Sequence, residues 1–130
     1  MSIEILHPWT ALGIPALGRV EFERITYDAG MEIHLKEEAG ERRRFYLKFS
    51  DLPTAFRITN ESMRLATMPI LTNEVRATSF FLVENSKFLK WLNSESFDIY
   101  KDDPIWHLAI LTDEWIDIIC NDDPKVIFKV

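Results

Sequence analysis

The stretch MEIHLK, residues 31–36, alternates apolar and polar side chains with the cleanest period of two in the chain. Because successive side chains of a β-strand point to opposite faces of a sheet, this alternation predicts a strand with one buried face. Turn signals flank it, DAG at 28–30 and EEAGE at 37–41. The alternation continues beyond both turns, over residues 19–27 and 44–49. These three segments predict an antiparallel meander.

Further strands are predicted from apolar segments over residues 54–59, 75–84, 105–111, 114–120 and 126–130. The last three are expected to follow one another in hairpin connection, because only short turn signals separate them. Residues 60–71 fit either a short helical turn or a continued edge strand. Residues 8–18 contain two prolines and two glycines, so we expect a loop there.

One helix is predicted near residues 86–94. Asn85 and Ser86 offer an N-cap, and an apolar stripe at helical spacing follows, made of Phe88, Leu89, Trp91 and Leu92. The stripe aromatics, with Trp106 and Trp115, are expected in the core. Strands on both sides of one helix, without βαβ alternation, predict the α+β class: a mainly antiparallel sheet of about 7–8 strands in a single domain over residues 1–130.

Composition narrows the class of protein. The 130 residues are 47% hydrophobic and contain one cysteine, so a packed core is expected and an internal disulfide is impossible. No apolar run is long enough for a membrane span, and the first residues do not resemble a secretory signal. We therefore expect a cytoplasmic protein.

The net charge of −6 is unevenly distributed. Residues 1–65 carry 9 basic and 10 acidic side chains, whereas residues 66–130 carry 6 and 11. This acidity disfavours nucleic acid as a partner and favours a basic protein, although acidity also serves solubility alone. The basic run at 42–44 is expected to be partly neutralised by Glu37, Glu38 and Glu41.

Recognised catalytic and cofactor motifs are absent from the sequence. The three histidines lack metal-ligand spacing, and the four glycines lie too far apart for a phosphate loop. We therefore expect no cofactor and no metal. His34 should be a solvated surface residue and Cys120 a buried, inert thiol. His107 is expected to be a partly buried, hydrogen-bonded residue, with a role as a site group as the alternative.

Acidic side chains gather in the C-terminal half, mainly at predicted turns, and the candidates for partner binding are Asp102, Asp103, Asp113, Glu114, Asp117, Asp122 and Asp123. They are either solvated turn residues or an acidic rim formed where the loops cluster. In a run of hairpins, alternate turns lie at the same end of the sheet. The turns near residues 102 and 122 should therefore share one end, and the turn near 113 should lie at the other.

Three stretches resemble a family: AFRITNE (55–61), FFLVENSKFLKWLNSESFDIY (80–100) and HLAILTDEWIDII (107–119). They are similar to segments of small bacterial proteins of toxin–immunity loci. This resemblance implies a cytosolic immunity protein that binds and blocks a cognate toxin domain. It assigns no functional residues.

Three functions follow as hypotheses. The first is an immunity-type inhibitor whose acidic surface covers a basic toxin domain, such as a nuclease. The second is a small-ligand or regulatory module, which requires a single deep apolar pocket under the helix with converging polar groups. The third is an enzyme using His107, which requires that His107 be exposed in a cleft and hydrogen-bonded to an acid. The oligomeric state is left open.

Overall fold

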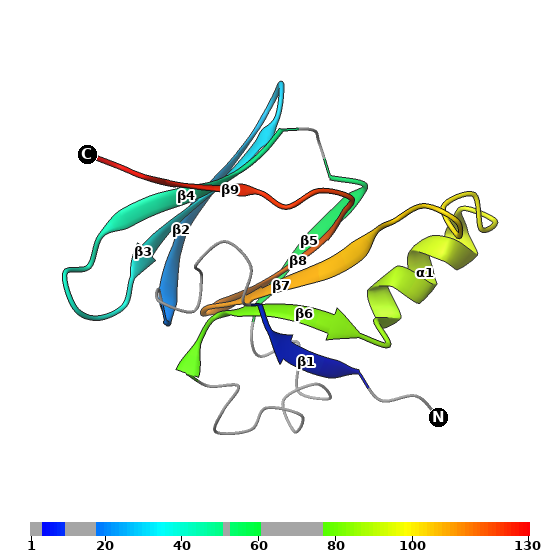
Figure 1. The fold of residues 1–130 in the computed structure, drawn as a ribbon, viewed down its shortest axis with the longest axis horizontal. Helices are drawn as coiled ribbons and strands as arrows, with labels where there is room; N and C mark the ends of the chain where they lie inside the picture. The colour runs from blue at the N-terminus through cyan, green and yellow to red at the C-terminus, as the bar shows by residue number, and fades with distance from the viewer. Residues whose placement is uncertain (1–3, 10–17, 51–52, 61–76) are drawn as a thin grey trace.

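The computed structural model describes residues 4–9, 18–50, 53–60 and 77–130 (Figure 1). Within them lie nine strands and one helix: β1 Ile5–Pro8, β2 Val20–Tyr27, β3 Met31–Glu37, β4 Arg44–Phe49, β5 Ala55–Asn60, β6 Phe80–Glu84, α1 Lys87–Glu95, β7 Trp106–Leu111, β8 Glu114–Cys120 and β9 Lys125–Phe128. The predicted α+β class is confirmed.

The strands form two antiparallel sheets, in the orders β2-β3-β4-β9 and β1-β6-β7-β8-β5. The predicted meander is β2-β3-β4, with the alternating residues Met31, Ile33 and Leu35 completely buried. They belong to one core cluster with Ile110 and Ile116 of the second sheet. The main core therefore lies between the inner faces of the two sheets.

Two strand predictions are corrected. The segment predicted as the third strand of a C-terminal hairpin run does not pair with β8. Instead, β9 crosses to the other sheet and pairs with β4, placing Phe128 opposite Phe45 with ring centres 5.3 Å apart. The predicted loop at the start contains the end of β1, which pairs with β6. Trp9 follows β1 and is 3% exposed, so it closes one side of the core.

The predicted helix is confirmed as α1, with Ser86 as its N-cap accepting a 2.9 Å hydrogen bond from the N–H of Leu89. Phe88 and Leu92 pack with Ile119 of β8, so α1 lies on the outer face of the second sheet, at the right of Figure 1. Trp91, predicted to be a core residue, is 53% exposed. The strand predicted at 75–84 begins at Phe80, and the predictions for 61–71 lie outside the described residues.

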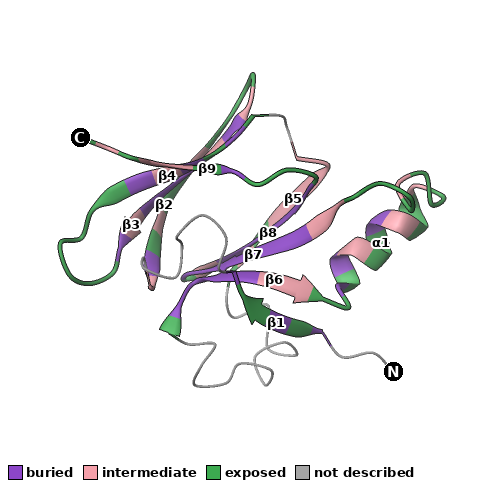
Figure 2. Ribbon diagram, in the orientation of Figure 1, coloured by how far each residue is buried: buried purple, intermediate pink, exposed green. Residues whose placement is uncertain are grey.

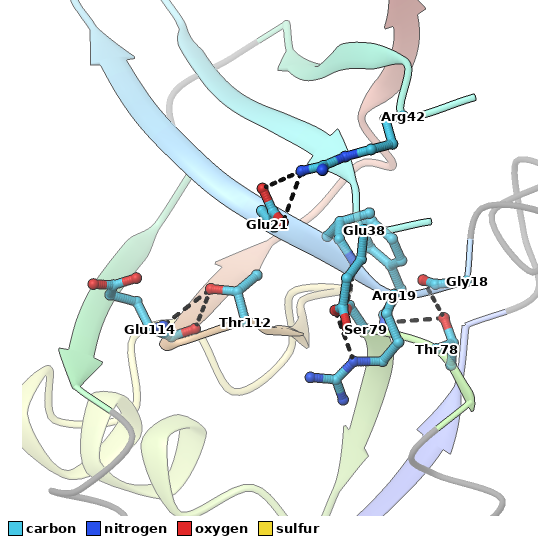
Figure 3. A network of polar contacts seen from close by, with 11 residues as sticks. Gly18, Arg19, Glu21, Glu38, Arg42, Thr78, Ser79, Thr112 and Glu114 are labelled. Atoms are coloured by element: carbon cyan, nitrogen blue, oxygen red, sulfur yellow. Dashed lines mark hydrogen bonds and ion pairs between the residues drawn. The ribbon is translucent and has the colours of Figure 1, made fainter. Parts of the chain in front are cut away.

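Polar contacts join the two sheets where β2 and β6 begin (Figure 3). Ser79 donates its N–H to the carbonyl of Gly18 over 3.2 Å, and its Oγ accepts the N–H of Val20 over 3.0 Å. Ser79 is completely buried, so these bonds satisfy backbone groups that would otherwise be costly to bury. They hold the start of β2 against the start of β6.

The basic run is neutralised by glutamates from two strands. Glu37 receives two bonds from the Arg43 guanidinium, at 2.8 and 3.1 Å, and the pKa of its carboxyl is lowered by them. Arg42 pairs with Glu21 and Arg44 with Glu23. Of the predicted residues, Glu37 forms an ion pair with the run and Glu41 acts on Arg43 through its charge, and two glutamates of β2, on the far side of β3, supply the other ion pairs.

Candidate functional site

The predicted acidic residues fall into three groups. Asp102, Asp103, Asp122 and Asp123 lie at one end of the β7–β8 hairpin, since Trp106 is the register partner of Cys120. All four are exposed, and no cation of the described residues pairs with them. Because the connection between β7 and β8 lies at the other end, the predicted sharing of one end by the turns near 102 and 122 is confirmed.

Asp113 and Glu114 occupy the other end of the hairpin. Thr112 binds both the N–H and the carbonyl of Glu114, at 3.0 and 2.8 Å (Figure 3). Asp113 lines a shallow hollow together with Arg19 and Glu38, which form an ion pair of 3.7 Å. Charges of both signs meet here, so this end does not extend the acidic group at residues 102–103 and 122–123.

Asp117 is not a surface residue, and its predicted place in an acidic rim is wrong. It is 1% exposed. Its Oδ2 accepts from Nε of Arg57 over 2.9 Å, and its Oδ1 lies 2.7 Å from Nε2 of His107. Asp117 lies on the outer face of β8, between β7 and β5, and its partners Arg57 and His107 both contact Phe88 of α1. Strand alternation alone gives no sign of these contacts.

The loop that follows α1 begins with a Schellman motif. The N–H of Asp98 donates to the carbonyl of Asn93 over 2.8 Å, and that of Phe97 to Ser94 over 3.4 Å. Phe97 consequently adopts a left-handed conformation with φ 51°. This position usually holds glycine, because a Cβ atom is strained there.

The side chain of Phe97 projects away from the protein. It is 93% exposed, and that of Ile99 is 68% exposed. The loop lies at the far right of Figure 1, and Figure 2 shows its tip as exposed. Residues 95–103 carry four acids and one lysine, so apolar and acidic side chains alternate along it. The term acidic loop surface is used below for the exposed residues Phe97, Asp98, Ile99, Asp102, Asp103, Asp122 and Asp123.

A separate cleft of about 440 Å³ runs along the edge strand β5, between α1 and the end of β2. It is lined by Pro53, Thr54 and Ala55, together with four aromatic side chains and one cation, namely Tyr27, Phe56, Arg57, Phe88 and Trp91. The Cζ atom of Arg57 lies 4.3 Å from the centre of the Phe88 ring, within cation–π range. The cleft therefore combines flat apolar walls with one positive group.

A buried polar network stands behind Arg57. Ser86 Oγ lies 2.6 Å from Nδ1 of His107, which in turn reaches Asp117 through Nε2. Ser86 Oγ also accepts the N–H of Leu89 over 2.9 Å, so the same hydroxyl caps α1 and contacts His107. The network runs from the start of α1 to the guanidinium in the cleft.

The hydrogen-bonded residues Ser86, His107 and Asp117 are of the types found in a catalytic triad, but their burial and contacts are those of a structural network. The side chains of His107 and Asp117 are each 1% exposed, and Ser86 is committed to capping α1. A second hollow of about 490 Å³ touches His107 but is lined mainly by Trp9, Leu82 and Trp106. The enzyme hypothesis required His107 to be exposed; its hydrogen bond to an acid is present, and its exposure is not.

His34 and Cys120 are both buried. Burial raises the pKa of the Cys120 thiol to about 12, which agrees with the inert thiol expected. The prediction for His34 is wrong: it is 4% exposed, because it lies on the central strand β3 between Arg24 and Tyr46 and its ring stacks on Tyr46 at 5.1 Å. No group of three or more potential metal ligands occurs within the described part of the chain.

Sequence reasoning missed Phe97 and the cleft. A signal for Phe97 was present, because no glycine follows the end of the helix predicted near residues 86–94. Arg57 and Tyr27 gave none, since a strand pattern does not show which distant side chains meet.

Comparisons with known proteins give no family. No protein-family model matches the chain, and no curated protein and no solved structure is significantly similar to it. Among the described residues, no helix has the length and apolar character needed to cross a membrane.

Proposed function

We propose that this chain is a cytoplasmic binding protein of the immunity type, which blocks a basic toxin domain, such as a nuclease, by covering it. The observation that carries the proposal is Phe97. A left-handed conformation costs a non-glycine residue about 1–2 kcal/mol, and a side chain that is 93% exposed recovers nothing from burial. Folding stability does not account for phenylalanine here, whereas contact with a partner does.

The surroundings of Phe97 favour a basic partner. Asp98 follows it directly, and Asp102 and Asp103 lie farther along the same loop. A second copy of this chain would bring the same negative charges against them, and an anionic lipid surface would also be repelled. A basic protein with an apolar pocket would attract the aspartates and also bury the Phe97 ring.

Interfaces of this kind depend on a few central anchors surrounded by polar groups. Exposed aromatic side chains are typical anchors, and rim charges mainly raise the association rate. Phe97 and Ile99 fit the first role, and the exposed aspartates fit the second. Inhibition by covering requires no reactive group of the inhibitor.

The test is affinity capture from the native host, with wild type compared with Phe97→Ala. The expected result is a protein rich in lysine and arginine that wild type retains and Phe97→Ala loses. Expression of that protein in a test bacterium should stop growth, and co-expression of the chain should restore it. Ile5→Ala is the matched control, because Ile5 is 43% exposed on β1, outside the acidic loop surface.

Two results would contradict the proposal. One is a captured partner that is acidic or equally well retained by Phe97→Ala. The other is a captured partner whose expression is harmless, or whose toxicity the chain fails to relieve.

A further inference from the structure

The cleft along the edge strand β5 has two aromatic walls, one on each face of that strand. One is the pair Tyr27 and Phe56, with ring centres 5.3 Å apart. The other is the stacked pair Phe88 and Trp91 on α1, at 5.7 Å. Tyr27 and Trp91 are 52% and 53% exposed, although such large rings normally gain stability from burial. Both walls therefore present ring surface to whatever enters the cleft.

Arg57 lines the same cleft and is held from two sides. Its Nε donates to the buried Oδ2 of Asp117 over 2.9 Å, and its plane lies over Phe88. The side chain is 38% exposed. Within the described residues, no acceptor binds the Nη atoms. A guanidinium offers its two Nη groups as a fork that fits a carboxylate.

The network behind Arg57 fixes its orientation. Asp117 accepts from Arg57 on one oxygen and from His107 on the other, and Ser86 orients His107. Burying a carboxylate and an imidazole is costly even when they are paired. Such a network gives the cation one fixed position, which is what selective binding of an anion requires.

The cleft also differs in charge from the acidic loop surface. Among the described residues that line the cleft, Arg57 alone is charged, and its side chain is 38% exposed. Flat walls and a fixed guanidinium together select a flat ring that bears one negative charge.

We propose that this cleft binds a small molecule that combines an aromatic ring with a carboxylate. The ring lies between the wall of Trp91 and the wall of Tyr27, and the carboxylate accepts from the Nη groups of Arg57. The site is separate from the acidic loop surface and does not depend on the immunity-type function.

The test uses benzoate and phenylacetate as probes, followed by protein NMR and calorimetry. Benzyl alcohol supplies the ring without the charge, acetate the charge without the ring, and phenyl phosphate a larger anion. The aromatic carboxylates should bind at least about tenfold more tightly than benzyl alcohol or acetate, the worth of one charged hydrogen bond or more. They should shift the Trp91 indole N–H and the Arg57 Nε–H signals.

Two variants remove different parts of the site. Arg57→Lys keeps the charge but loses the fork, and should weaken benzoate binding about tenfold. Trp91→Ala removes an exposed ring, leaves the core intact and should weaken binding of every aromatic probe. Arg24→Gln is the matched control, since Arg24 is an exposed arginine on β2 outside the cleft. Phe97→Gly should leave benzoate binding unchanged.

Three results would overturn the proposal: equal binding of benzoate and benzyl alcohol, binding that survives Trp91→Ala and Arg57→Lys, or no binding of any probe at millimolar concentration. Preference for phenyl phosphate over benzoate would also reject the carboxylate. If only a captured partner protein perturbed Trp91, the cleft would belong to the protein interface. None of these outcomes depends on whether toxicity is relieved.

Discussion

Arg57 and Asp117 are 60 positions apart in the chain, yet they are direct register partners on β5 and β8 and are joined by a 2.9 Å hydrogen bond. The bond links the cleft to the buried Asp117 on the outer face of the second sheet. Arg57 keeps partial contact with solvent, whereas Asp117 is almost completely enclosed. The two partners therefore contribute differently to stability.

Asp117→Ala should lower the free energy of unfolding by about 3 kcal/mol, because Arg57 and His107 both lose an acceptor and a buried space remains. Urea denaturation followed by circular dichroism measures this. Asp113→Ala, an exposed acid on the adjoining turn, should change stability by no more than about 0.5 kcal/mol. Equal effects of the two variants would show that the buried network does not stabilise the fold.

Phe97→Gly should raise the free energy of unfolding by about 1 kcal/mol, since glycine adopts the left-handed conformation without strain. Phe97→Ala keeps the Cβ atom and so keeps the strain, and its stability should stay close to wild type. Thermal unfolding of the three proteins compares them. A glycine variant less stable than wild type would mean that the Phe97 ring does contribute to folding.

The acidic loop surface should control the rate of partner binding. Replacing Asp102, Asp103 and Asp98 with asparagine should slow association with the captured partner and flatten its dependence on salt, with dissociation changed less. Stopped-flow mixing at several salt concentrations measures both rates. An association rate equal to wild type at low salt would reject electrostatic steering by these residues.

Cys120 should make stability fall in alkaline solution. Its pKa is raised from 9.0 to about 12 by burial, so above pH 9 the unfolded chain loses the thiol proton while the folded protein retains it. Ionisation then favours the unfolded state, and the contribution is lost as pH rises from 9 to 12. Cys120→Ala should show a shallower decline over this range. Parallel curves for the two proteins would contradict the assignment.

His34 should make folding stability fall in acidic solution. Burial lowers its pKa below the ordinary 6.5, so below pH 6.5 the unfolded chain takes up a proton more readily than the folded protein. Stability is therefore complete above pH 6.5 and decreases as the solution is acidified. His34→Gln should flatten this decrease, and an unchanged decrease would contradict the assignment. Unfolding curves from pH 7 to pH 5 provide the comparison.

Local pattern predicted the elements well and their partners poorly. The alternation of residues 31–36 and the apolar stripe of α1 are local signals, so β3 and α1 were found close to their observed bounds. The pairing of β9 with β4 joins residues about 80 positions apart. No turn signal specifies such a contact, and the nearest strand was expected instead.

The candidate site was predictable only in part, for a similar reason. Acidic turns are visible in sequence, and four of the seven predicted acids do lie exposed at one end of the β7–β8 hairpin. Burial of Asp117 depends on α1 and β5 covering it. The exposure of Trp91 depends on where the edge of α1 meets the sheet. Both are properties of the assembled layers.

The position of β9 has a consequence for synthesis of the protein. The first sheet is begun by residues 20–49, but the hydrogen-bonding edge of β4 is closed only by residues 125–128. During translation this edge stays open until residues 125–128 have left the ribosome. An open strand edge invites pairing with other chains, so the nascent protein is exposed to misassociation until β9 pairs with β4.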